Sequence, residues 1–162
     1  SDLPYDDRYT PVSTLTQPAL VALAQADAQK AVAYALVGIN NENNSWAYEC
    51  ANVVAKFGTA ADIEKVNQSF KTRKVLLQLN YVIILAENME RGGAEGKKMV
   101  DILVDDVANS ESTVVKYYAQ KLLEEQISIM EESAKTANPE KAAILKEMAK
   151  YARAKRDVLG TE

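Results

Sequence analysis

VLLQLNYVIILAENM, residues 75–89, decides the fold because this stretch is apolar around nearly its whole circumference. From Val82 to Ala86 no polar residue interrupts it, and a helix that is hydrophobic on every side has to be covered by neighbours. Arg91-Gly92-Gly93 follows shortly after, and paired glycines favour a turn. We therefore expect the most buried helix of the protein at this position.

The residues on both sides of this helix also favour helices. Positions 19–138 contain no proline and are rich in Ala, Leu, Lys, Glu and Gln, which is typical of helices joined by short turns. The prediction is an all-α fold of five to seven helices, as an antiparallel bundle or a short helical-hairpin array. Apolar spacing predicts helices over about 18–37, from Asn44 or Ser45 to Gly58, and over 59–70, 75–89, about 94–108, 112–137 and 139–159.

Three local signals predict how individual helices begin and end. Gly38 is expected to close the first helix in a left-handed conformation. Thr59 and Asp62 have the spacing of a capping box. Asn138-Pro139 predicts a short turn, so the two long helices beside it should pack antiparallel.

The predicted domain organisation is an extended amino-terminal arm over residues 1–17 and a single all-α domain over residues 18–162. The arm, SDLPYDDRYTPVSTLTQ, has no helical period. Ordering an extended segment with two tyrosines is expensive unless it packs on something. Tyr5, Arg8 and Tyr9 are therefore candidate partner-binding residues. The longest wholly apolar run, from Tyr81 to Ala86, is too short to cross a bilayer, so no transmembrane segment is expected.

The residue types that are missing exclude several kinds of chemistry. The chain has no histidine, which removes Ser-His-Asp and Cys-His catalysis and imidazole metal sites. Cys50 is the single cysteine, which excludes a disulfide within the chain and CxxC sites. Neighbouring carboxylates such as Asp105-Asp106 point about 100° apart on a helix, and we expect them on a solvated face. The prediction is a protein that is not an enzyme, with no catalytic residue, metal or cofactor; a carboxylate-dependent enzyme is the third alternative.

The charge balance limits the class of partner. With 23 acidic and 19 basic residues the net charge is −4, whereas nucleic-acid binders carry a basic footprint. Nucleic acid is therefore not expected as a partner. Lys71, Arg73 and Lys74 form a basic cluster that suits an acidic protein partner. The compartment stays open: the sequence starts at Ser1 without a signal core, which fits a processed protein of a secreted or organellar lumenal compartment.

An alternative function is a helical carrier of a small apolar ligand or pigment. Trp46, Tyr48 and Cys50 lie on one short predicted helix, and with the helix at 75–89 they would line the pocket of such a carrier. A cysteine on the same stripe as a tryptophan is more often a small buried side chain than a reactive thiol. The carrier and the docking protein therefore stand as separate hypotheses.

Two segments resemble known families. Residues 45–70 and 99–123 resemble helical-hairpin repeats of the HEAT type, with an apolar first helix (Met99, Ile102, Leu103), a polar turn and a second helix opening Val114-Val115-Lys116. This resemblance implies stacked helical hairpins that bind other proteins. Lys116 departs from the arginine usual at that position, and the repeat spacing is irregular.

Residues 112–160 resemble the closing helix pair of the four-helix extrinsic subunits that dock on the lumenal side of oxygen-evolving photosystems. The residues that carry this resemblance are Ala134-Lys135 and Asn138-Pro139-Glu140-Lys141-Ala142. It implies peripheral association with a photosynthetic membrane complex through protein contacts. The main expectation from the sequence is a non-enzymatic helical subunit that docks on a partner protein or a larger assembly.

Overall fold

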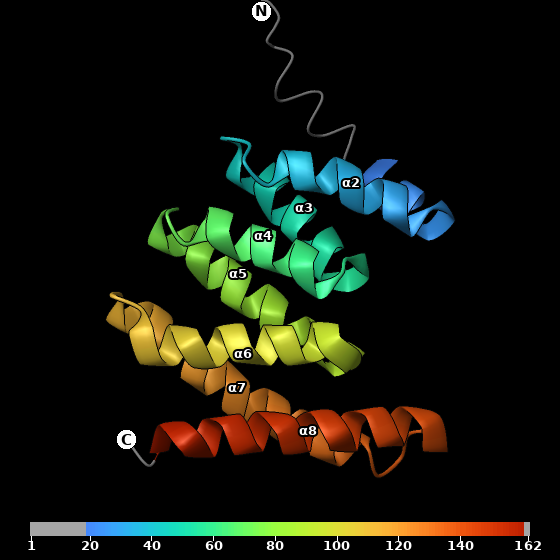
Figure 1. Ribbon diagram of the computed structural model, residues 1–162, viewed down its shortest axis with the longest axis vertical. Helices are drawn as coiled ribbons and strands as arrows, with labels where there is room; N and C mark the ends of the chain where they lie inside the picture. Colours follow the sequence, from blue (N-terminus) through green and yellow to red (C-terminus); the bar gives the residue numbers. More distant parts are fainter. Residues whose placement is uncertain (1–18, 161–162) are drawn as a thin grey trace, which may run out of the picture. The chain divides into compact units, whose positions relative to one another are not determined.

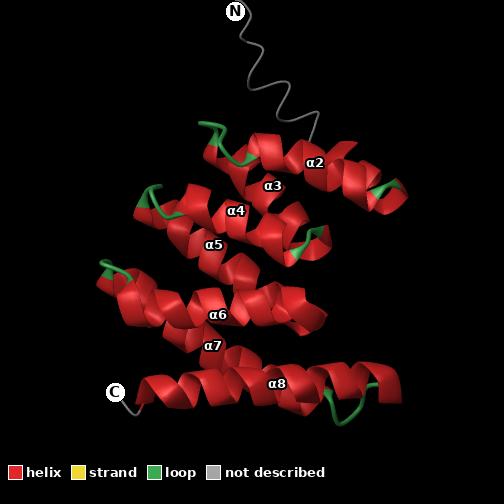
Figure 2. Cartoon of the chain, viewed as in Figure 1, coloured by secondary structure: helices red, strands yellow, loops and turns green. Residues whose placement is uncertain are grey.

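The computed structural model describes residues 19–160, and every regular element in that range is helical (Figure 2). The all-α prediction is confirmed. A first helix over 19–26 is followed by α2 (Ala28–Gly38), α3 (Asn44–Phe57), α4 (Ala60–Phe70), α5 (Val75–Asn88), the 3-10 turn η1 (Met89–Arg91), α6 (Gly93–Asn109), α7 (Thr113–Ser133) and α8 (Pro139–Gly160). The predicted arm over 1–17, with Tyr5, Arg8 and Tyr9, lies outside the described residues.

The number of helices is larger than predicted, because Asp27 breaks the helix expected over 18–37. Residues 19–160 form eight α-helices rather than five to seven. Asp27 has extended backbone angles (φ −152, ψ 92), and its side chain accepts a hydrogen bond of 3.1 Å from the amide of Lys30. An aspartate that caps a new helix in this way competes with continuation of the previous one.

Other helix ends follow the expected signals more closely. The capping box is confirmed: Thr59 Oγ1 accepts from the Asp62 amide at 3.1 Å, and the Thr59 amide donates to Asp62 Oδ2 at 3.0 Å. Asn43 caps α3, in place of the predicted Asn44 or Ser45. The helix predicted to reach residue 137 ends at Ser133, and the following residues form tighter turns before the proline.

The described chain divides after Gly58 into two compact units. The prediction of one domain stays a prediction. In the first unit α2 packs on α3. Gly38 ends α2 as predicted but without a positive φ, which occurs instead at Gly92 and Gly93, where η1 passes into α6. What Gly38 provides is space, since a Cβ atom there would lie 2.4 Å from Cys50 Sγ and 2.8 Å from Trp46 Nε1.

The second unit consists of α4 to α8 (Figure 1). Helix α6 packs against both α4 and α8, and α5 packs against α7. Met99, Leu103, Leu123, Met130 and Leu145 are fully buried in this core. Helices α7 and α8 run in opposite directions, since Arg153 pairs with Glu131 whereas the later Arg156 pairs with the earlier Glu124.

The prediction that α5 is buried on nearly all sides is wrong for one of its faces. Leu77, Tyr81 and Leu85 are buried, but Leu76 is 69% exposed and Ile83 lies on the same open face. No element of the second unit covers that face, because α5 meets its partners with the opposite side. Among the described residues no helix has the length and hydropathy needed to cross a membrane.

Because α2 and α3 approach closely at Gly38, even the methyl group of an alanine at this position should disturb their packing. We expect Gly38→Ala to lower the free energy of unfolding of the first unit by about 1–3 kcal/mol, because Cys50 and Trp46 would have to move. Urea unfolding followed by the fluorescence of Trp46, the single tryptophan, measures this unit. Adding Cys50→Ala to Gly38→Ala should recover part of the loss. An unchanged midpoint for Gly38→Ala would contradict the close approach.

Candidate functional site

A groove of about 760 Å³ lies in the second unit, where the turn between α4 and α5 faces the end of α6 and the loop that follows it. Its apolar residues are Phe70, Val75, Tyr81 and Val115. Its polar residues are Asn67, Lys71, Gln78, Asp105, Asp106, Asn109, Ser110, Glu111 and Ser112. The groove is large enough for a small ligand or a few residues of a peptide.

Two buried aromatic rings form the floor of this groove. The Phe70 and Tyr81 rings meet edge to face, with centroids 5.1 Å apart and planes inclined by 62°. The Tyr81 hydroxyl donates to the carbonyl of Ile63 at 3.4 Å. Burial raises the pKa of Tyr81 well above its ordinary value, and the nearby Asp106 and Glu64 charges act in the same direction. The Tyr81 hydroxyl therefore keeps its proton at neutral pH, and the side chain is an uncharged part of the groove.

Asp106 is the unusual charged group of the groove. Burial raises the pKa of its carboxyl from 3.8 to about 6; Lys71 acts to lower that pKa and Asp105 to raise it. The prediction that both aspartates face solvent is therefore wrong for Asp106, which is only partly accessible, and right for Asp105, which is exposed. Near neutral pH Asp106 is mostly ionised in an environment that solvates it poorly.

The groove as a whole carries negative charge. Among the described residues that line it, Asp105, Asp106 and Glu111 contribute three carboxylates and Lys71 one ammonium. Asp105, Asp106 and Asn109 also belong to the last turns of α6, where the helix dipole adds partial negative charge. A concave surface of one sign raises the local concentration of the opposite ion, so this groove favours a cationic group.

Exposed apolar side chains also occur on α5 and α7, two helices that pack on each other. Leu76 and Ile83 lie on the open face of α5, and Tyr117, which is 60% exposed, lies with Tyr118 on the face of α7 opposite its buried side. The two tyrosine rings meet edge to face, with centroids 5.4 Å apart. Val75, the residue before Leu76, is itself 44% exposed and lines the groove. We call Leu76, Ile83, Tyr117 and Tyr118 the α5–α7 face.

The residues predicted to bind a partner or ligand are distributed over both units. Lys71, Arg73 and Lys74 form the bend between α4 and α5, and of the three only Lys71 lines the groove. The Arg73 guanidinium lies 5.9 Å from the centroid of the Phe70 ring. In the first unit Trp46 and Cys50 are buried beside Gly38, and Tyr48 is partly exposed.

The chemical state of Cys50 follows from its position in that contact. Burial raises the pKa of the Cys50 thiol to about 12, with a smaller contribution from Glu49. The thiol is therefore protonated at neutral pH and is a weak nucleophile. Trp46 packs edge-on against Tyr34 at 6.4 Å. These side chains fill the contact between α2 and α3. That the protein carries a small apolar ligand or pigment stays a prediction.

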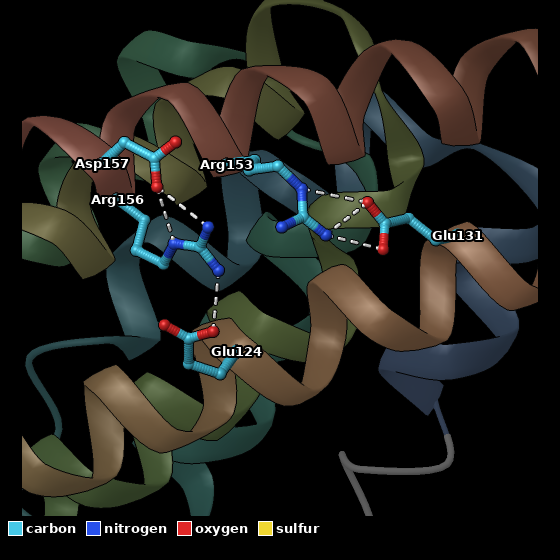
Figure 3. A network of polar contacts seen from close by, with 5 residues as sticks. All are labelled: Glu124, Glu131, Arg153, Arg156 and Asp157. Atoms are coloured by element: carbon cyan, nitrogen blue, oxygen red, sulfur yellow. Dashed lines mark hydrogen bonds and ion pairs between the residues drawn. The ribbon is translucent and has the colours of Figure 1, made fainter.

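A second polar cluster joins α7 to α8 (Figure 3). The Arg153 guanidinium donates to both carboxylate oxygens of Glu131, at 2.6–3.1 Å, and Arg156 donates to Glu124 and to Asp157 at 2.9 Å. Hydrogen bonds to Asp157 and Glu124 raise the pKa of Arg156. The charges satisfy one another within the protein, so this cluster is a contact between helices and a weaker candidate for a ligand site than the groove.

Three residues of the groove were not predicted from the sequence to share a site. Asn67, Gln78 and Tyr81 come from helices whose polar positions gave no signal of a shared site. Within residues 19–160 no group of three or more His, Cys, Asp or Glu side chains is placed to hold a metal ion. Neither a protein-family model, nor a curated protein sequence, nor a solved structure matches this chain.

Poor solvation of Asp106 predicts a pH-dependent gain in stability when its charge is removed. The folded pKa of about 6 exceeds the ordinary value of 3.8, so the ionised group destabilises the fold above pH 6 and this effect fades as the pH falls toward 3.8. We expect Asp106→Asn to raise the free energy of unfolding by about 1–2 kcal/mol at pH 7.5 and by much less at pH 4. Urea unfolding followed by circular dichroism measures the free energy of unfolding at both pH values. Glu125→Gln, which removes an exposed carboxylate from the middle of α7, is the control. A loss of stability at pH 7.5 in Asp106→Asn would refute the assignment.

The cluster between α7 and α8 should contribute little to stability. Arg153 and Glu131 are 45% and 44% exposed, so solvent screens their attraction. A double-mutant cycle with Arg153→Ala and Glu131→Ala should give a coupling energy of at most about 1 kcal/mol, and 1 M NaCl should reduce it. A coupling above about 2 kcal/mol would mean that this pair is a main link between the two helices.

Proposed function

We propose that this chain is a non-enzymatic helical subunit that binds a partner protein through the α5–α7 face. The observation that carries the proposal is the exposure of Leu76 and Tyr117, which are 69% and 60% accessible on neighbouring helices. Exposed apolar and aromatic side chains that gather on adjacent elements are typical of protein-binding surfaces. Scattered single residues would not support this interpretation.

The arrangement of the second unit supports the same function. Helix α6 packs between α4 and α8, while α5 and α7 pack on each other (Figure 1). This pattern favours an array of helical hairpins such as α6 with α7, similar to the HEAT-type repeat that residues 99–123 resemble. In such arrays one layer of helices offers a continuous surface for binding other proteins.

The partner segment that fits this surface is amphipathic and basic. Its apolar side chains would cover Leu76, Ile83 and Tyr117, whereas its positive charges would lie toward the groove with Asp105, Asp106 and Glu111. Complementary charge increases the rate of association and fixes the register of the segment. An acidic partner at the basic cluster over 71–74 stays a separate prediction, and of that cluster only Lys71 reaches the groove.

Site-specific photo-crosslinking in the native extract tests this proposal. A benzoylphenylalanine placed at position 76 or at position 117 should capture the same protein, and one placed at Lys146, which is exposed on α8, should not. Mass spectrometry of the adducts identifies the captured protein and the segment bound. Different proteins at the two positions, or equal capture at position 146, would contradict a binding face on α5 and α7.

The purified partner then allows a quantitative test. Leu76→Ser and Tyr117→Ser should each weaken its binding by about 10- to 100-fold, since exposed anchors of this kind contribute about 1–3 kcal/mol. Both side chains are largely solvent-exposed, so the variants should keep the circular dichroism spectrum of the parent. Lys146→Ser is the matched control and should bind as the parent does. Unchanged binding by both serine variants would refute the proposal.

A further inference from the structure

The groove has features that the α5–α7 face alone does not explain, and the inference from them rests on the proposed function. We propose that the groove is a pocket for one arginine or lysine side chain of the partner segment, with its charged end at Asp106. Asp105 and Glu111 stand at the rim, and the apolar stem lies along Val75 above the floor of Phe70 and Tyr81.

The size and the position of the groove fit an arginine or lysine side chain of the partner segment. Its volume of about 760 Å³ holds a long side chain together with part of the backbone that bears it. Val75 belongs both to the groove and to the exposed part of α5. We therefore expect a segment that lies on Leu76 to place a nearby side chain in the groove.

The Asp106 carboxylate of the groove has no close partner of opposite charge among the described residues. No hydrogen bond or ion pair among the described residues ends on the Asp106 carboxylate, and Lys71 influences it only as a nearby charge. A partly buried carboxylate without a close partner is costly for the folded protein. An arriving guanidinium or ammonium would supply that partner through a charge-assisted hydrogen bond.

The aromatic floor also suits a cation. The ring of Phe70 already has a guanidinium, that of Arg73, at 5.9 Å from its centroid. Phe70 and Tyr81 stay neutral, and the negative face of an aromatic ring attracts a cation. The stem of an arginine or lysine is apolar along most of its length and can pack on Val75 and Val115.

Lys71 is the one cationic side chain among the described residues that line the groove, and its removal should change binding in the opposite direction to the removal of Asp106. Asp106→Asn removes the attracting charge and should weaken binding, whereas Lys71→Gln removes a repelling charge and should strengthen binding. Glu140→Gln and Lys146→Gln make the same charge changes on exposed parts of α8. These two controls separate an effect of the groove from an effect of net charge.

Binding should also depend on pH. The titratable or charged groups that face Asp106 are Lys71 from the turn after α4, Tyr81 from α5, Asp105 from α6 itself and Glu111 from the loop before α7. With a pKa of about 6, Asp106 loses its charge between pH 7.5 and pH 5. The affinity for a cationic side chain should fall over that range.

The experiment uses the full chain labelled with ¹⁵N and a capped pentapeptide, acetyl-Gly-Leu-Arg-Leu-Gly-amide, followed by NMR. The control peptide has citrulline, which keeps the shape of arginine without its charge. We expect the arginine peptide to shift the amides of Val75, Asp106 and Asn109, and to bind about tenfold more tightly than the citrulline peptide at pH 7.5. Asp106→Asn should remove most of that difference, and Lys71→Gln should tighten arginine binding by about twofold to threefold.

The outcomes separate this inference from the proposed function. Equal affinity for the two peptides, or an unchanged arginine affinity in Asp106→Asn, overturns the pocket, and the effects of Leu76→Ser and Tyr117→Ser on the partner still decide the α5–α7 face. Shifts confined to residues outside the groove also overturn it. Asp106→Asn is expected to fold, since it removes a poorly solvated charge, and its circular dichroism spectrum checks this.

Discussion

The burial of α6 between α4 and α8 is the contact on which the second unit depends. Met99 and Leu103 of α6 are fully buried. The start of α6 packs so closely on η1 and α8 that a Cβ atom at Gly96 would lie 2.6 Å from the carbonyl of Met89 and 3.0 Å from Met148 Cε. Close packing of this kind fixes where the end of α6 lies. It brings Asp105 and Asp106 opposite the turn between α4 and α5, and the groove results from that placement.

Much of the fold could be predicted from the sequence because its signals are local. The capping box at Thr59 and the stop at Gly58 depend on neighbours a few residues away, and both occur as predicted. The break at Asp27 is also a local feature, because an aspartate three residues before Lys30 can cap a helix. The regular apolar spacing on both sides of Asp27 nevertheless favours one continuous helix over 18–37.

The candidate site was harder to predict, because burial there depends on contacts between distant parts of the chain. Nothing near Asp106 in the sequence shows that Phe70 and Tyr81 will remove water from it. The exposure of Leu76 is likewise decided by which side of α5 its neighbours cover. Both features reduce the stability of the isolated chain, as poorly solvated charge and uncovered apolar surface do, and binding of a partner would relieve both.

Hydrogen–deuterium exchange of the chain within its gently purified native complex, compared with the free chain, tests the central claim most directly. If α5 and α7 form the binding face, residues 75–88 and the segment from Asn109 to Lys121 should exchange more slowly in the complex. The exposed side of α8 around Lys146 should exchange equally in both samples. Protection confined to α8, or no protection of α5 and α7, would contradict the account.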